Sequence, residues 1–379
     1  MALPPRTRIM LIFAVYAVPI GGLFSRIAEV QMALGLSKAA FGLALGLQPL
    51  GILLGTLVAA AVTDALGTRR TLMAVFAGSA FTPLLIGFAQ GFWTLSAAMF
   101  VFGLVQSFGG IALNVEADRV AHATHRPIMS KCHGAWGVGV LITSGLGVVA
   151  IKAGLAPTGQ FWVLLAVLLA STAVLVRPMQ QCPPRALAAQ RGARRIALPD
   201  RVSFLLMGFA LCGIVLEVIA RNWSVIYLRD ALGAVDWVAA LALPAFMVMQ
   251  TAGRFVADEV VVRIGEVRLG RALALISAAG LALLVGAGSI PTALLACALM
   301  GLGSSAIFPM SMSALARRTQ RPASESLAGF SILQNLAFIA APSLFGVVAG
   351  AMDLRIAMAL LLPLPFVALY YSRALQSPA

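Results

Sequence analysis

Twelve long apolar runs constrain the fold of this chain more than any other feature of its sequence. A transmembrane helix needs about 20 apolar residues, and each run is long enough to cross a bilayer as a tilted helix. A transmembrane β-barrel would instead show alternating segments of about ten residues, which this sequence lacks. We therefore predict an all-α membrane protein. The approximate spans are 9–28, 40–62, 71–91, 93–117, 132–153, 157–177, 203–226, 236–257, 269–288, 290–315, 326–351 and 355–373.

The composition agrees with a membrane environment. Hydrophobic residues make up 61% of the chain and charged residues 11%, whereas soluble proteins average about 45–50% and about 25%. A soluble core of this size cannot hide so much apolar surface from water. The chain therefore needs lipid as part of its solvent.

Basic residues are distributed unevenly along the chain, which has 27 Lys and Arg against 13 Asp and Glu. With a cytoplasmic N-terminus and alternating spans, 21 of the 27 lie on the inner side and six on the outer side. The positive-inside rule then predicts a multi-pass protein of the bacterial inner membrane with both termini cytoplasmic. The net charge of +14 thus reflects topology, and no nucleic-acid partner is expected. Four tryptophans near outer helix ends fit an interfacial belt: Trp93, Trp162, Trp223 and Trp237.

The two halves of the chain repeat each other. Three matched features lie 194 or 195 residues apart: Arg26 and Arg221, Asp64 and Asp258, and Arg126-Pro127 and Arg321-Pro322. A common offset at three equivalent places indicates duplication. We predict two pseudo-symmetric six-helix bundles, at 1–178 and 203–379, joined by a cytoplasmic linker at 179–202.

A cytoplasmic motif follows the second apolar run, at Asp64-Ala65-Leu66-Gly67-Thr68-Arg69-Arg70. It resembles the signature of the major facilitator superfamily (MFS) at Asp64, Gly67, Arg69 and Arg70, although Ala60, Ala65 and Thr68 depart from it. A looser second copy contains Gly253-Arg254, Asp258, Arg263 and Gly265. An Asp at a helix end can pair with arginine or with helix N-terminal N–H groups. The resemblance thus implies a cytoplasmic latch between the halves, made by Asp64, Gly67, Arg69, Arg70, Asp258 and Arg263. Ordinary topogenic charges are the alternative.

A narrower resemblance rests on Asn114 to Gly134, on Glu217 to Asp230 and on Gly301 to Pro309. These segments are similar to a bacterial inner-membrane subgroup near rhizopine-related and fucose-permease-like transporters, which implies a small, polyhydroxylated solute. The span-four arginine of drug:proton antiporters is missing from Gly103–Ser107, and 134–153 has no proline. By our alignment Gly110 replaces the fucose-permease carboxylate. Neither proton-coupling scheme therefore transfers residue by residue.

Charges inside the apolar runs are rare, and charges within a bilayer are expensive and often functional. Glu217 lies about 14 residues into the seventh run, which places it in the outer half of the membrane. Arg221 is one helical turn away and can pair with it. Arg26 and Glu29 occupy the matching region of the first run. We predict that these four charges converge near an outer vestibule and couple protons or gate transport. A static Glu217–Arg221 pair is the alternative.

Uncharged polar side chains in the apolar runs are the candidate substrate ligands. Interhelical hydrogen bonding is their alternative role, worth about 0.6 kcal/mol per bond in membranes. For Trp223, a position in the interfacial belt is an equally good interpretation. The candidates are Gln106, Asn114, Asn222, Trp223, Ser304, Gln334 and Asn335, with Gln48, Gln250 and Ser305 as further members.

These features predict a secondary active transporter, not an enzyme. It moves a small polar solute by alternating access, with protons as coupling ion. The sequence lacks the Gly-x-x-x-x-Gly-Lys-Ser/Thr motif that would indicate ATP binding. Neither a cofactor nor a metal is expected. The expected partners are the solute, protons and the lipid bilayer, and the chain is expected to be a monomer. Two alternatives stay open: proton-driven efflux of amphipathic compounds, and a non-transporting membrane receptor or scaffold.

Overall fold

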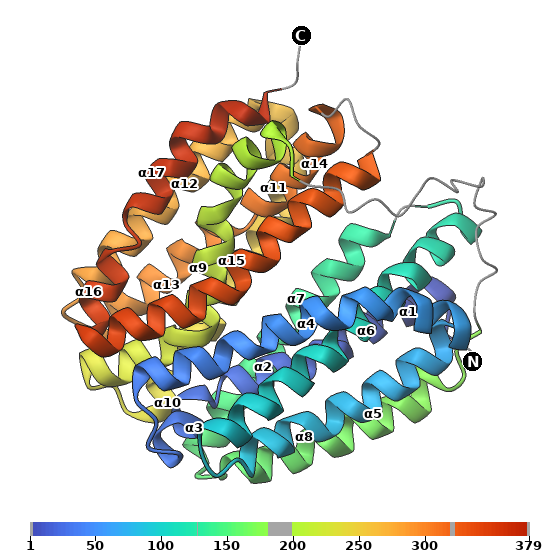
Figure 1. Cartoon of the computed structure of the whole chain (residues 1–379), viewed down its shortest axis with the longest axis horizontal. Helices are drawn as coiled ribbons and strands as arrows, with labels where there is room; N and C mark the ends of the chain where they lie inside the picture. The colour runs from blue at the N-terminus through green and yellow to red at the C-terminus, as the bar shows by residue number, and fades with distance from the viewer. Residues whose placement is uncertain (1–2, 127, 181–198, 319–322, 377–379) are drawn as a thin grey trace. The chain divides into compact units, whose positions relative to one another are not determined.

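The computed structural model describes residues 3–126, 128–180, 199–318 and 323–376 of the chain (Figure 1). The predicted linker at 179–202 lies largely outside these ranges. The elements are helices throughout the described part, and no strand occurs there.

The described residues of the first half of the chain form nine helical elements. They are α1 (Pro5–Tyr16), α2 (Val18–Phe24), α3 (Ile27–Ala33), α4 (Lys38–Leu66), α5 (Thr68–Gly87), α6 (Phe92–Ala123), α7 (Met129–Lys152), α8 (Pro157–Ser171) and the π-helical η1 (Thr172–Val176).

The part of the second half that the structure describes forms ten. They are α9 (Arg201–Leu232), α10 (Asp236–Ala239), α11 (Ala242–Ile264), α12 (Glu266–Val285), α13 (Ile290–Ser304), α14 (Ile307–Arg318), α15 (Ala323–Ala351), α16 (Leu354–Ala359), α17 (Pro363–Tyr371) and the 3-10 segment η2 (Ser372–Leu375).

Within the described residues, these elements make twelve helical stretches that are long and apolar enough to span a membrane, as the sequence predicts. Prolines explain why several spans consist of two helices. Proline lacks an N–H and cannot complete the helical hydrogen bonding. Pro19 follows the interruption at Ala17, Pro244 follows the one at Leu241, and Pro363 begins α17.

The chain forms two compact units. The first consists of Met1–Leu36 and Leu43–Gly192, and the second of Ser37–Gly42 and Ala193–Ala379. The sequence did not predict that Ser37–Gly42, around the beginning of α4, belong to the second unit.

Helix α9 is the central element of the second unit. Asp200 caps its beginning by accepting a hydrogen bond from Ser203 N, and Gly233 ends it in a left-handed conformation. Both are typical helix-end signals. Helices α11, α13, α14, α15 and α17 all pack against α9. The residues of α9 therefore lie at the core of this unit.

Both units contain a very close helix approach at an equivalent glycine. A Cβ on Gly301 in α13 would lie 2.1 Å from the Phe246 carbonyl oxygen in α11. A Cβ on Gly103 in α6 would lie 1.8 Å from the Gln48 carbonyl oxygen in α4. The two pairs are 198 residues apart, which supports the internal repeat independently of the charged motifs. Small residues allow helix backbones to approach in membranes.

We expect Gly301→Val to destabilise the second unit, because α11 and α13 must move apart to admit the side chain. Overpacking costs about 1–3 kcal/mol, which thermal unfolding of the purified protein in detergent measures as a lower Tm. Gly145→Val in α7 is the matched control, since nothing lies within 4 Å of its Cβ position. An equal loss of stability in both variants would contradict this explanation.

Candidate functional site

Glu217 lies at the middle of α9. It comes sixteen residues after Arg201 and fifteen before Leu232, or about 24 Å and about 22 Å at 1.5 Å per residue. The sequence predicted a position in the outer half of a span ending at 226. The helix is longer than the predicted span, because α9 continues to Leu232, and the depth of Glu217 in the membrane stays a prediction. The carboxylate is therefore equally far from both helix ends.

Two side chains of α11 bind this carboxylate. Gln250 Nε2 donates to Glu217 Oε2 at 2.9 Å, and Arg254 NH2 donates to the same oxygen at 3.0 Å. Residues 250 and 254 are one helical turn apart and therefore share a face of α11. The ion pair is partly shielded, with side-chain exposures of 22% for Glu217 and 25% for Arg254. The three residues form a polar cluster, which we call the Glu217 cluster.

A backbone carbonyl completes the contacts of Arg254. Its Nε donates to the Ser305 carbonyl oxygen at 3.2 Å. In a continuous helix that oxygen would accept from the residue four positions on, which is Pro309. Proline has no N–H to donate, so the carbonyl is available to the arginine. Pro309 thus leaves a backbone acceptor free, and Arg254 bonds to it.

These contacts correct one sequence expectation and extend another. Arg254 was counted among the residues of the inner helix ends and loops, but it lies within α11, twelve residues after its beginning. Arg254 forms an ion pair with Glu217 that the sequence did not predict, while Arg221, the expected partner, also interacts electrostatically with Glu217. Arg221, one turn along α9, is half-buried.

A second polar cluster surrounds Arg26 in the first unit. Arg26 is fully buried in the interruption between α2 and α3. Its Nε donates to Gln160 Oε1 at 2.6 Å and its NH2 to the Leu155 carbonyl at 2.8 Å. Its NH1 pairs with Glu29 at 2.8 Å. The guanidinium is thus bonded on all three nitrogens, which is how a buried charge is made tolerable.

The interruption itself supplies an anchor for this cluster. Arg26 N bonds to the Leu23 carbonyl, which leaves the Gly22 carbonyl without its usual helical donor. Gln160 Nε2 donates to that carbonyl at 3.0 Å. The Arg26 cluster therefore ties α2, α3 and α8 together. The predicted convergence of Arg26 and Glu29 with Glu217 and Arg221 stays a prediction.

The candidate amides of α6 differ in their surroundings. Gln106 is 5% exposed, and its amide oxygen and nitrogen find no hydrogen-bond partner among the described residues. Asn114 is half-buried and donates to the Gly110 carbonyl at 2.8 Å. Buried amides without partners are unusual because they lose their bonds to water. The amide of Gln106 is therefore available for hydrogen bonds to water or to a solute.

The candidates of the second unit show the same contrast. Asn222 is 3% exposed and its Oδ1 has no partner within the described ranges. Ser304 bonds back to the Gly301 carbonyl at 3.2 Å. Gln334 and Asn335 are half-buried on α15, and Asn335 donates to the Ser331 carbonyl.

Trp223 is not a belt residue. Its side chain is fully buried, against the expectation of an interfacial position. Its ring lies edge-on to Phe41, with centroids 6.2 Å apart, and 5.1 Å from Phe345. The apolar cluster that surrounds the indole explains its burial. Its Nε1 has no partner in the described part of the chain.

The predicted latch residues Asp64, Arg69, Arg70, Asp258 and Arg263 are exposed. Gly67 makes a one-residue turn between α4 and α5 with φ 80°, and Gly265 makes the same turn between α11 and α12 with φ 85°. Positive φ favours glycine. The turn is thus repeated, 198 residues apart, which the motif comparison did not align.

The residue after each turn makes the contact that the motif analysis missed. Thr68 Oγ1 donates to the buried Glu116 at 2.5 Å, and Arg119 lies 3.9 Å from the same carboxylate. At the equivalent place of the second unit, Glu266 pairs with Arg317 at 2.6 Å. Both contacts tie the turn to the fourth span of its own half. Whether Asp64 and Asp258 latch the halves stays a prediction.

The comparisons with known proteins decide the family. A model of the Major Facilitator Superfamily matches residues 9–342. The chain belongs to the major facilitator superfamily. A relative in Sinorhizobium fredii, the uncharacterized transporter y4wD, is 27% identical over 346 residues and covers 91% of both chains.

Solved structures give the same fold for this MFS chain. A crystal structure of the nucleoside transporter NupG (D323A mutant) matches with TM-score 0.78 and 12% identity, covering 98% of this chain and 100% of that one. A D-xylose-proton symporter matches with TM-score 0.74 and 12% identity, covering 98% and 97%. The predicted fold class is confirmed, and the chain is a multi-pass membrane transporter and not an enzyme.

The sequence of this MFS protein contains signals for these contact residues, of which only Gln160 was not among the predicted ones. Gln250 and Arg254 are two polar residues at a four-residue spacing in an apolar run, and Gln160 is a lone amide in another. The spacing indicates a polar helix face but not its partner. Only the packing of α11 on α9 selects Glu217.

Proposed function

We propose that this MFS transporter moves a small hydroxyl-bearing solute across the inner membrane by alternating access, driven by protons. Both termini are then cytoplasmic, and the chain works as a monomer. The observation that carries the proposal is the Glu217 cluster: a carboxylate at the middle of α9, bonded by Gln250 and Arg254 on one oxygen.

The cluster provides a two-state contact. An ionised Glu217 attracts the Arg254 guanidinium through charge and a hydrogen bond, which is stronger than a neutral bond. A proton on Glu217 removes the charge and weakens that pair. Arg254 and Gln250 then become free to bind another acceptor, such as a solute hydroxyl. Proton binding and solute binding are coupled because the ionised carboxylate and the solute compete for the same donors, and a proton on Glu217 releases them.

Unpartnered amides support a hydroxyl-bearing solute. Gln106 and Asn222 each bury an amide atom without a partner among the described residues, and a hydroxyl can both donate to and accept from an amide. Asn114, Ser304, Gln334 and Asn335 remain the further candidate ligands. Two structural neighbours are named for a nucleoside and for D-xylose, so pentoses and nucleosides belong in the first solute panel.

A solute panel on the purified protein tests this proposal. We expect pentoses, polyols, amino sugars or nucleosides to raise Tm in detergent and to drive counterflow in proteoliposomes. Asn114→Ala should weaken the response to a ligand that contacts this amide. The control is Gln90→Ala, an exposed amide in the short segment between α5 and α6. Stabilisation by hydrophobic cations alone would overturn the proposal in favour of efflux of amphipathic compounds.

A further inference from the structure

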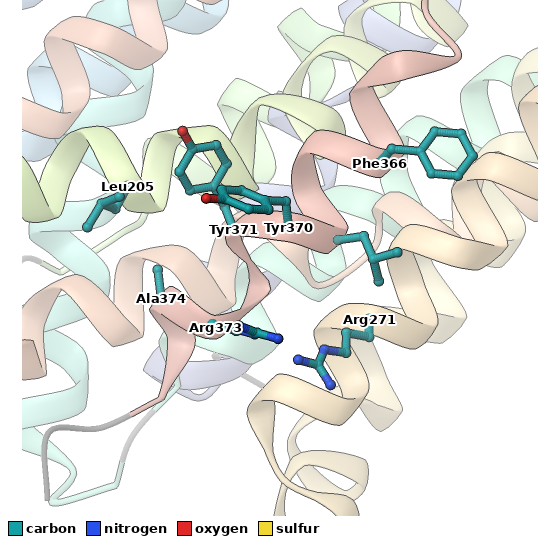
Figure 2. Close-up of a pocket in the computed structure, with 8 residues that line it drawn as sticks. Leu205, Arg271, Phe366, Tyr370, Tyr371, Arg373 and Ala374 are labelled. Carbon is teal, nitrogen blue, oxygen red and sulfur yellow. The ribbon is translucent and has the colours of Figure 1, made fainter.

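A basic and aromatic pocket lies outside the Glu217 cluster, at the ends of α9, α12 and α17. It is a cavity of about 910 Å³ whose lining includes Arg271, Arg373, Phe366, Tyr370 and Tyr371 (Figure 2). Arg271 comes from the second turn of α12, and Arg373 from η2. The pocket is thus built by elements that are far apart in the sequence.

The two arginines give the pocket a positive end. Figure 2 shows both guanidinium groups on the same side of the pocket. Arg271 Nε donates to Ser372 Oγ at 3.3 Å, which holds α12 against η2. Neither arginine forms an ion pair with a carboxylate in the described ranges, and the lining contains no acidic residue. Two like charges near one space are stabilised by an anion between them, and arginine matches phosphate geometry well.

The other end of the pocket is apolar. Tyr370 is 75% exposed and Phe366 is 57% exposed, on the same face of α17. A neighbouring groove of about 640 Å³ shares Phe366, Tyr370 and Tyr371 with the pocket and continues along α17 past Val367 to Leu362. This groove has no charged residue in its lining. A positive end that continues into an apolar groove fits a ligand with an acidic head and a hydrocarbon chain.

Close packing on α9 shapes the wall between the two ends. A Cβ on Gly208 would lie 2.6 Å from Tyr371 Cδ2, so the tyrosine ring rests directly on the α9 backbone. The rings of Tyr370 and Tyr371 are perpendicular, with centroids 5.0 Å apart. Tyrosine is enriched at the membrane–water interface, where its ring meets lipid and its hydroxyl meets headgroups.

We propose that this pocket binds an anionic glycerophospholipid, with Arg271 and Arg373 bonding the phosphate and an acyl chain lying along α17. Basic pockets between transmembrane helices recognise acidic headgroups in this way. In the orientation proposed above, the pocket belongs to the cytoplasmic leaflet. The site itself depends neither on that orientation nor on the transported solute.

Lipid binding to the delipidated full-length protein in detergent tests the proposal. We expect phosphatidylglycerol to bind saturably in native mass spectrometry and to raise Tm, and phosphatidylcholine with the same acyl chains to do neither. The double variant Arg271→Gln/Arg373→Gln should bind phosphatidylglycerol about tenfold more weakly or worse. Phe366→Ala should also weaken binding, with the charges intact.

A matched double variant separates a site from general surface charge. Arg263→Gln/Arg268→Gln removes two exposed arginines that are outside the pocket lining, so phosphatidylglycerol binding should stay unchanged. An equal loss in both double variants would overturn the proposal. Displacement by glycerol phosphate at comparable concentration would also overturn it, because the site would then bind a soluble phosphate and not a lipid. The Tm of each variant without added lipid reports whether it folds.

Discussion

Glu217→Gln is expected to abolish proton-driven accumulation while leaving the protein folded and inserted. A gradient of one pH unit supplies about 1.4 kcal/mol per proton, enough for about tenfold accumulation of a solute. Glutamine keeps an oxygen that can accept from Gln250 and Arg254 but cannot exchange a proton. In proteoliposomes with an imposed pH gradient, the ratio of internal to external solute should therefore fall to about one. Counterflow of the same solute should persist.

The control for this variant is Glu259→Gln. Glu259 is an exposed carboxylate on α11, outside the Glu217 cluster, so accumulation should be unchanged. Arg254→Gln adds a second arm, because it removes the ion pair at 3.0 Å and leaves the carboxylate in place. Normal accumulation by Glu217→Gln would remove this residue from proton coupling. The transporter would then need another coupling group or another driving ion.

Arg26→Met is expected to be the most destabilising substitution of a single charge. It leaves Glu29 without the guanidinium 2.8 Å away and leaves Gln160 without its donor at 2.6 Å. Breaking a buried pair by removing one partner costs about 3–5 kcal/mol. The expected result is a large loss of folded protein after purification and a much lower Tm. Arg26→Lys should not rescue it, since one ammonium cannot reach all three acceptors.

A double variant identifies the cause of that loss. Arg26→Met/Glu29→Gln should recover part of the stability, because the carboxylate that has lost the guanidinium is then replaced by a neutral amide. Arg268→Met, an exposed arginine of α12, is the control and should change the free energy of unfolding by no more than about 0.5 kcal/mol. A stable Arg26→Met protein that fails only in transport would contradict the structural role. It would favour the gating role that the sequence suggested for Arg26 and Glu29.

The membrane fold follows from local sequence signals. Twelve apolar runs predict twelve helical spans, because the backbone N–H and C=O groups of each run must bond to one another inside the lipid. Helix ends were less accurate. The seventh run was expected to end at 226, whereas α9 continues to Leu232 and Gly233 ends it, so Glu217 lies at the middle of its helix.

The partners of the polar residues depended on tertiary packing. Helical spacing correctly suggests that Arg221 lies one turn from Glu217, but it cannot show which face of α11 packs on α9. Arg254 reaches Glu217 only through that packing, and Pro309 leaves it a carbonyl to bond. The predicted interfacial position of Trp223 was wrong for the same reason. Packing against Phe41 and Phe345 overrides the preference of tryptophan for the membrane interface.

By itself, the sequence predicted that this chain lies in a membrane, that it has twelve membrane-spanning stretches and that its halves are related. Those properties depend on the length of the apolar runs, the asymmetry of the basic residues and the spacing of the repeats. All three can be measured along the sequence alone. Only the tertiary structure decided that Arg254 pairs with Glu217, that Gln160 holds Arg26 and that Arg271 and Arg373 share a pocket. Such contacts join residues tens to more than a hundred positions apart, and side-chain packing in three dimensions selects each partner.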